Sequence, residues 1–363
     1  MRTATVSTLE TISSNPVLTL RTGFELELLA PRGSSRADLA RELARRAGGR
    51  VRPVLHLDTE PSLVPGIGHF LHLTPGFAVD DAAGAPLATL VDDITITADL
   101  DARAPAMPGW YRLLSDEPRL IRLVARLADP ALAMADTVAP IAAAFGSVVE
   151  AIGDAVRVDD PAGATVVIGL PVRGERERPC EIVTPPLTHD HEATLDALLS
   201  PARELGFTVP AEAAVHLHVD AAPFRTVPAF ANAVRLFAHW RDALREVLGT
   251  NPRCVRLAPL PDALVALVEQ PWRSWDELRA AARTTGLTKF FDVNLVKVIA
   301  DRPDRHTVEV RILPGSLDAA DVVRRAALVE ALLLRCLDPA PLPRPTGAAT
   351  AVDELRALAQ GAA

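Results

Sequence analysis

The sequence predicts an α+β protein built on an antiparallel β-sheet. Apolar strands and amphipathic helices are mixed along the chain without the strict strand–helix–strand spacing of a doubly wound sheet. Several strands carry polar side chains at every second position, as in a sheet that buries one face only. The 363 residues are 49% hydrophobic and 23% charged, a globular composition that excludes a largely disordered chain. The length predicts two domains or one large one.

The composition also excludes several classes of partner. A net charge of −8 argues against broad nucleic-acid binding and against binding to an anionic membrane surface. The longest apolar stretches, such as residues 326–334, fall short of the ~20 residues that cross a bilayer. The first ten residues lack the apolar core of a secretory signal. The three cysteines, which show neither zinc spacing nor a disulfide framework, are Cys180, Cys254 and Cys336. We therefore expect a cytoplasmic protein without nucleic-acid or membrane partners.

Two strands and a helix begin the predicted fold. Alternating apolar residues predict a strand within residues 17–30. Leucines at helical spacing predict the helix that follows, with Ser34 or Ser35 as its N-cap and Gly48-Gly49 at its end. A second strand is expected over residues 50–57.

Residues from about 64 to 160 are interpreted as an inserted α/β subdomain. A β stretch interrupted by Gly and Pro runs to about residue 100, and helices are expected over residues 118–127 and 130–145. The alternating polar residues after Asp92-Asp93 are interpreted as one solvated strand face, with a role in a lid as the alternative.

The remaining elements alternate between strands and helices. The strands are expected over residues 164–170, 180–184, 213–219, 289–299 and 307–313. The helices are expected over residues 191–205, 227–248, 275–283 and 319–337. Past Asp338 a Pro-rich run breaks the pattern, and a short amphipathic helix over residues 351–359 closes the chain.

Polar pairs on the predicted strands indicate where the chemistry lies. Side chains two residues apart on a strand project from the same face of the sheet. The pairs are Glu25 and Glu27, His216 and His218, and Glu309 and Arg311, and Glu181 adds a single carboxylate on a fourth strand.

Each pair alone has a simpler explanation. A Glu-x-Glu pair is typical of the solvated face of a sheet, and a His-x-His pair occurs both in metal sites and as ordinary histidines. A Glu-x-Arg pair most often forms weak cross-strand ion pairs. In combination, however, carboxylates and imidazoles are ligands of divalent cations, and an arginine suits a phosphate. The set as a whole therefore predicts a metal and phosphate site.

These residues lie in motifs that resemble those of the amidoligases, relatives of glutamine synthetase and glutamate–cysteine ligase. Gly23–Glu27 resembles the family's opening G-x-E-x-E strand. The other motifs follow in the family's order: CEIVTPPL with Glu181, AVHLHVD with His216 and His218, FFDVNL with Asn294, and EVRILPG over residues 309–315. The sequence departs from the family at Ala214, where a Gly is usual, and at residues 58–62, where the D-x-S segment is stretched.

The resemblance implies a glutamine synthetase-like funnel of antiparallel strands backed by helices, which binds ATP and Mg²⁺ or Mn²⁺ on its concave face. The implied reaction joins a carboxylate to an amine, on small-molecule or peptide substrates, through an acyl phosphate. The implied domain is a single catalytic one over residues 1–338, interrupted by the insertion and followed by residues 339–363 as a Pro-rich segment and short helix.

The resemblance also implies individual roles. One metal ion would be bound by Glu25, His216 and Glu309, and a second by Glu27 and Glu181. Arg311 would grip a phosphate, and His218 would contact the nucleotide phosphates. Asn294 is placed with Glu309 and Arg311 in the catalytic group.

Two lysines, Lys289 and Lys297, are the only ones in the sequence. A GC-rich genome explains their rarity, although both flank Asn294. We assign Lys289, together with His218 and Arg311, to cofactor binding. On a regular strand over residues 289–299 the lysines would not share a face with Asn294, and we expect Asn294 to face the funnel.

Two other functions remain open from the sequence. A kinase on the same fold would phosphorylate a guanidino nitrogen or a carboxylate without ligation. A non-catalytic module would retain the funnel to hold a peptide or a metal ion.

Overall fold

The structure, a computed structural model, describes residues 17–58, 71–254, 256–300 and 306–361, so residues 59–62 of the stretched segment lie outside it. The protein is α+β with antiparallel strand pairing, as predicted. Its chain divides into two compact units. The first unit comprises Met1–Glu27, Thr184–Ser200 and Ala211–Ala363, and the second comprises Leu28–Val183 and Pro201–Pro210.

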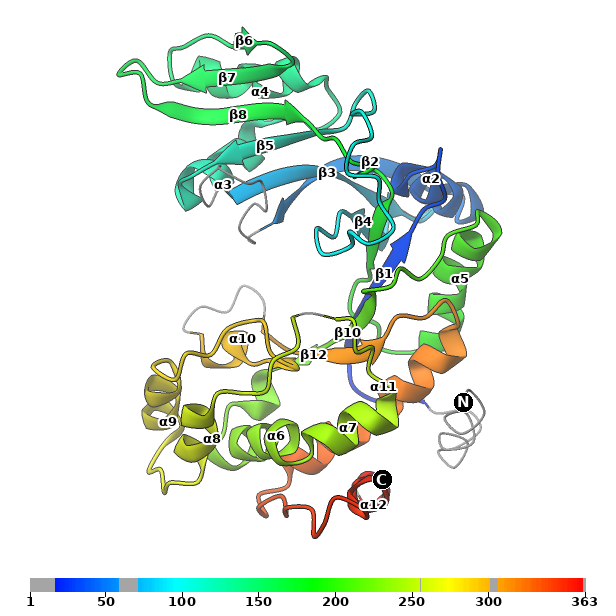
Figure 1. The fold of residues 1–363 in the computed structure, drawn as a ribbon, viewed down its shortest axis with the longest axis vertical. Helices are drawn as coiled ribbons and strands as arrows, with labels where there is room; N and C mark the ends of the chain where they lie inside the picture. The colour runs from blue at the N-terminus through cyan, green and yellow to red at the C-terminus, as the bar shows by residue number, and fades with distance from the viewer. Residues whose placement is uncertain (1–16, 59–70, 255, 301–305, 362–363) are drawn as a thin grey trace. The chain divides into compact units, whose positions relative to one another are not determined.

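The first unit contains four antiparallel strands in the order β11-β12-β10-β1 (Figure 1). Their bounds are Thr22–Leu29 for β1, Ala214–Asp220 for β10, Val293–Asn294 for β11 and Thr307–Pro314 for β12. Alternate residues of these strands are apolar and almost fully buried, among them Phe24, Leu217 and Val310. The predicted one-sided burial is therefore present, and it leaves the alternate polar residues together on the other face.

Helices separate and follow these strands along the chain. They are α5 (His191–Glu204), α6 (Val227–His239), α7 (Arg241–Leu248), α8 (Asp262–Val268), α9 (Trp275–Ala282), α10 (Val296–Ile299), α11 (Ala319–Leu337) and α12 (Ala351–Gln360). α6 packs on α11, α7 packs on β12, and the closing helix α12 packs on both α7 and α11 (Figure 1).

Two predicted elements of this unit are wrong in detail. The helix expected over residues 227–248 is divided at Trp240, whose buried indole donates a hydrogen bond to the Pro343 carbonyl at 2.9 Å. The strand expected over residues 289–299 is confined to β11. The Asn294 Oδ1 accepts a hydrogen bond from the Val296 N–H at 3.1 Å, and this local bond turns the chain into α10.

The second unit contains strands in the order β9-β4-β3-β5-β8-β7-β6, with β2 paired to β3. Their bounds are Arg50–Asp58 (β2), Leu71–Asp80 (β3), Pro86–Val91 (β4), Tyr111–Ser115 (β5), Glu150–Ile152 (β6), Ala155–Asp159 (β7), Thr165–Pro171 (β8) and Pro179–Val183 (β9). The three helices of this part are α2 (Arg36–Arg46), which Ser35 caps as predicted, α3 (Pro118–Leu127) and α4 (Met134–Ala144).

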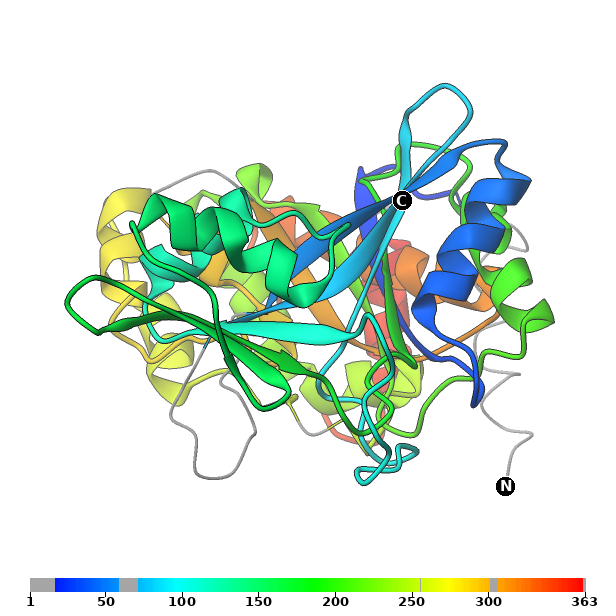
Figure 2. The same ribbon diagram turned by 90° about the horizontal axis from the view of Figure 1, so that it is seen from above.

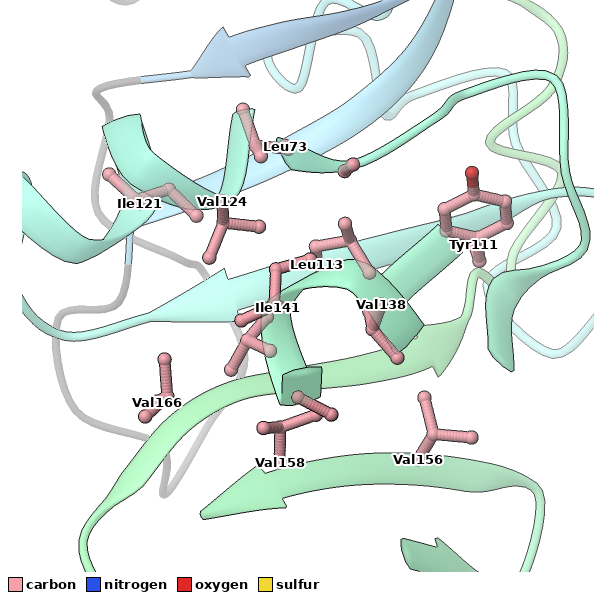
Figure 3. Packing of buried hydrophobic residues seen from close by; sticks show 13 residues of the cluster. Leu73, Tyr111, Leu113, Ile121, Val124, Val138, Ile141, Val156, Val158 and Val166 are labelled. Atoms are coloured by element: carbon pink, nitrogen blue, oxygen red, sulfur yellow. The ribbon is translucent and has the colours of Figure 1, made fainter. Parts of the chain in front are cut away.

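One face of these strands forms an apolar core. α2 packs against β2, β3 and β4, whereas α3 and α4 pack against β3, β5, β7 and β8 (Figure 2). Figure 3 shows the core between α3, α4 and the strands, where Leu73 and Leu113 meet Ile121 and Ile141. Residues on the opposite face, such as Arg112, therefore point away from this core.

The segment after β4 is not the solvated strand that the alternation predicts. Asp92 is buried, and its carboxylate pairs with the guanidinium of Arg176. Asp93 accepts hydrogen bonds from the backbone and hydroxyl of Thr95, which form a turn. Tertiary ion pairing and local side-chain bonds therefore hold this segment as a loop.

Candidate functional site

The polar face of the first unit's sheet brings five of the predicted site residues together. In the antiparallel register Glu25 pairs with His216, and His218 pairs with Glu309. Because these residues sit on adjacent strands with the same alternation, their side chains project from one face. The fifth residue, Glu27, lies two positions beyond Glu25 on β1.

Glu25 lies between the two histidines. Its Oε2 is 2.9 Å from the Nδ1 of His216, and its Oε1 is 3.0 Å from the Nε2 of His218. The Nδ1 of His218 lies 3.2 Å from the hydroxyl of Thr307. Both imidazoles are thus held in fixed orientations by groups on neighbouring strands.

His216 is surrounded by carboxylates. Its Nε2 lies 3.3 Å from Glu27 Oε1, and its Nδ1 lies 3.8 Å from Glu309 Oε1 in addition to its contact with Glu25. Glu27 is oriented by a second bond, since its Oε2 accepts from the Ala214 N–H at 2.7 Å. Ala214, the residue that replaces the family's Gly, therefore contributes through its backbone.

Glu309 is positioned by two donors. Asn294 donates from Nδ2 to Glu309 Oε2 at 2.7 Å, and Arg311 pairs with Glu309 Oε1. Arg311 lies two residues beyond Glu309 on β12, next to the point where the pairing of β10 and β12 shifts register between Val215 and Leu217. The Nε of Arg311 is buried and has no hydrogen-bond partner among the described residues.

These contacts shift the protonation of the group. Burial raises the pKa of Glu25, but the charge of His218 and hydrogen bonds with both histidines hold it well below its usual value. Burial likewise raises the pKa of Glu309. The positive charges of Arg311 and the histidines outweigh this effect, so the pKa of Glu309 is lower than usual. For His218, burial lowers the pKa, but Glu25 and Glu309 raise it to a net value above the usual one. The carboxylates therefore remain ionised at neutral pH.

Sequence reasoning gave no site role to two residues that act on this group, and the places of two residues to which it did give a role, Lys289 and Glu181, follow from the structure. Thr307 and Lys297 were missed: Thr307 contacts His218, and the charge of Lys297 acts on the same imidazole. Because β11 ends at Asn294, the argument that the lysines and Asn294 exclude one another fails. Lys289 precedes β11, with its ammonium 5.6 Å from the Phe290 ring centroid. Glu181 lies on β9 of the second unit, opposite Val91.

The donor set fits a divalent cation. One ligand atom each from Glu25, His218 and Glu309 lie within 4.8 Å of one another. With Glu27, three carboxylates face one guanidinium, so the group carries excess negative charge when the two histidines are neutral. Burying like charges this closely is costly unless a cation compensates them. Carboxylates with one imidazole suit Mn²⁺, and Mg²⁺ through the carboxylates.

Comparison with known proteins gives one match. The model of a family described as "putative amidoligase enzyme" matches residues 18–333 of the chain. No curated protein and no solved structure matches. No helix within the described ranges is both long and apolar enough to cross a membrane.

Proposed function

Because the chain belongs to the amidoligase family, we propose that it is an ATP-dependent ligase that forms an amide bond between a carboxylate and an amine. The observation that carries the proposal is the buried group of Glu25, Glu27, His216, His218, Glu309 and Arg311 on one sheet face. We place the protein in the cytoplasm, with small-molecule or peptide substrates and a glutamine synthetase-like fold.

The proposed reaction has two steps. A carboxylate oxygen of the substrate attacks the γ-phosphorus of ATP, the bond to the β,γ-bridging oxygen breaks, and ADP leaves. The amine then attacks the acyl carbon, the carbon–oxygen bond breaks, and inorganic phosphate leaves with the former carboxylate oxygen. Such transfers depend mainly on positioning and on neutralising phosphate charge.

The chain's own residues have distinct parts in this proposal. Glu25, His216 and Glu309 would hold one metal ion, although the imidazole grouped with both carboxylates within 4.8 Å is that of His218. Glu27 and Glu181 would contribute to a second ion. When bound, the ions neutralise phosphate oxygens. Arg311 grips a phosphate, for which its partnerless Nε is a ready donor. Asn294 positions Glu309 through its amide, and His218 contacts the nucleotide. Lys289 remains a proposed cofactor contact.

An oxygen-transfer experiment tests the reaction. The protein is incubated with ATP, Mn²⁺ or Mg²⁺, an amine mixture and ¹⁸O-carboxylate acids, and products are read by mass spectrometry. We expect new amides and one ¹⁸O in the released phosphate. Phosphorylated product without amide would instead identify a kinase. Absence of any nucleotide-dependent shift in melting temperature in the presence of Mg²⁺ would identify a non-catalytic module.

Glu309→Gln tests the metal assignment. A neutral amide is a poor ligand for hard cations, so we expect the variant to fold, to lose the Mn²⁺-dependent rise in melting temperature and to lose activity. Glu246→Gln, on the exposed side of α7, is the matched control. Metal binding and turnover like those of the parent protein in Glu309→Gln would refute the assignment.

A further inference from the structure

A cavity in the second unit is lined by residues to which no role has been assigned so far. Its volume is about 640 Å³, within the range of small-molecule sites. His72 of β3, Arg112 of β5 and Leu170 of β8 line it. Arg112 pairs with Leu170 in the antiparallel register, next to Leu113, which faces the core. The cavity therefore lies on the sheet face opposite α3 and α4.

Its walls are mainly apolar. The loop after β4 contributes Ile94 and Leu100, and the end of β8 with the segment that follows contributes Pro171 and Val172. The loop after β4 is fixed in place, because Arg176 donates to the Ile96 carbonyl at 2.6 Å and to the Asp93 carbonyl at 2.6 Å. The cavity is thus a preformed feature of the loop–sheet packing rather than a gap left by a mobile connection.

The polar groups of the lining are predominantly cationic. Three guanidinium groups, those of Arg112, Arg173 and Arg176, line the cavity with one carboxylate, that of Asp154. Arg173 and Asp154 pair with each other at 2.9 Å, and both are largely exposed. Arg112 lies deeper, with a side chain 15% exposed, and its NH2 group is 3.7 Å from the buried carboxylate of Asp92.

The buried carboxylate of Asp92 interacts with several guanidinium groups, among them those of the lining residues Arg112 and Arg176. It pairs with Arg176, and Arg36 is 4.0 Å away. Arg36 itself is occupied elsewhere, since it donates to the Pro75, Arg176 and Pro179 carbonyls. A half-buried arginine such as Arg112 beside an apolar wall matches a ligand with an anionic head and an apolar body, because a guanidinium binds a carboxylate through parallel hydrogen bonds.

We propose that this cavity binds an organic carboxylic acid, with its carboxylate at Arg112 and its apolar body against Ile94, Leu100 and Leu170. The ligand class is an aryl- or alkyl-substituted acid rather than a small inorganic anion, because the apolar walls would bury the hydrocarbon part. This binding does not depend on the proposed ligase activity.

Binding is measured by calorimetry in EDTA without nucleotide, with 4-phenylbutyrate as the probe. The neutral isostere 4-phenylbutyramide and inorganic phosphate serve as comparison ligands. We expect the acid to bind at least ~10-fold more tightly than the amide, equivalent to ~1.4 kcal/mol, and phosphate not to displace it. Equal binding of acid and amide, or full displacement by phosphate, would overturn the proposal.

Variants locate the site. Arg112→Gln is expected to weaken binding of the acid at least ~10-fold and to leave binding of the amide unchanged. Leu170→Asp is the second variant, since a carboxylate on the same face should repel the acid selectively. Arg50→Gln, an arginine of the same unit with a 69% exposed side chain, is the control. If Arg112→Gln and Leu170→Asp both bind the acid normally, the site lies elsewhere and the inference fails.

The two proposals fail in distinguishable ways. Arg112-dependent binding of 4-phenylbutyrate, in a protein that forms no amide from any acid and amine supplied with ATP, would refute the ligase and retain the cavity. ATP-dependent amide formation by a protein whose Arg112→Gln and Leu170→Asp variants bind 4-phenylbutyrate normally would retain the ligase and refute the cavity.

Discussion

Arg311 shows how much one side chain depends on its immediate surroundings. It pairs with Glu309, lies on a bulged strand and keeps a buried Nε without a partner in the described part of the chain. Burial lowers its pKa, but Glu309 and the other carboxylates raise it above the usual value. A permanently charged, planar group is thus held at the edge of a cluster of carboxylates, the arrangement needed to receive a phosphate.

Arg311→Lys is therefore expected to be a severe substitution. Lysine keeps the charge but loses the bidentate geometry, so we expect a loss of about 2–4 kcal/mol in transition-state stabilisation, as for one preorganised donor. The measurement is kcat for amide formation, with Arg324→Lys on α11 as the control. A variant that keeps nearly full activity would show that Arg311 does not contact the phosphate.

The His218–Glu25 pair predicts a pH dependence of the metal-free protein. The raised pKa of His218 means that its stabilisation is complete below its ordinary value of 6.5 and is lost as the pH rises through the raised value. The lowered pKa of Glu25 means that its stabilisation is present above 4.5 and is lost as the pH falls through the lowered value. The ion pair therefore stabilises the folded protein most between pH 4.5 and pH 6.5, the ordinary pKa values of the two groups.

His218→Gln should reveal this window. The difference in free energy of unfolding between parent and variant is expected to reach ~3 kcal/mol between the two ordinary pKa values, the low end for breaking a buried pair. This difference should become smaller at pH values below the window and at pH values above it. Urea unfolding in EDTA across a pH series measures it, with the exposed His189→Gln as control. A difference that does not vary with pH would contradict the ion pair.

At the scale of elements, the step from β11 to α10 positions both an amide and a lysine. The two-residue strand ends at Asn294, whose side chain binds Glu309 with one atom and starts the turn with the other. The short helix that follows carries Lys297, whose charge acts on His218. A regular strand would have sent these side chains to opposite faces.

Asn294→Ala is expected to lower the free energy of unfolding and the Mn²⁺-dependent shift in melting temperature more than Lys297→Ala does. Loss of the Asn294 amide removes one hydrogen-bond donor from the buried Glu309 carboxylate and the acceptor that holds the turn at Val296. Leaving a buried polar group without its partner costs about 1–3 kcal/mol of stability. Loss of Lys297 removes only a charge. The readouts are the free energy of unfolding and the Mn²⁺-dependent shift in melting temperature, and the opposite order of effects in both would disprove this role for Asn294.

At the scale of the molecule, the C-terminal segment closes the helical layer of the first unit. The buried Asn232 of α6 donates to the Asp338 and Ala340 carbonyls at 2.9 Å each and accepts from the Leu342 N–H at 2.8 Å. The indole of Trp240 holds Pro343 in the same way. A Pro-rich segment that cannot form regular structure is thus fixed by side chains of one helix.

Asn232→Ala should release this segment. Several buried hydrogen bonds lose their partner, so we expect destabilisation of about 1–3 kcal/mol and faster proteolysis within residues 339–350. Gln270→Ala removes an exposed amide from the same unit and is the control. Unchanged proteolysis and stability in Asn232→Ala would show that α12 alone retains the C-terminus.

The sequence by itself determined the α+β class and the one-sided strands. Alternation is a local property with a period of two, so it assigns Glu25, Glu27, His216, His218 and Glu309 to polar faces without knowledge of any neighbour. The first and last residues of helix α2 are likewise determined locally, by the capping side chain of Ser35 at its start and by the glycines that follow its end. The matching order of motifs is what made the family recognisable.

Only the tertiary structure decided which faces meet and where the regular patterns break. The register of β1, β10 and β12 depends on pairing between residues about 90 to 200 positions apart, which no local pattern encodes. The break at Trp240, the bulge at Arg311 and the loop around Asp92 each follow from a contact with a distant segment or strand. Long-range hydrogen bonds and buried ion pairs override local propensity at these positions, because a buried polar group must find its partner wherever the fold provides one.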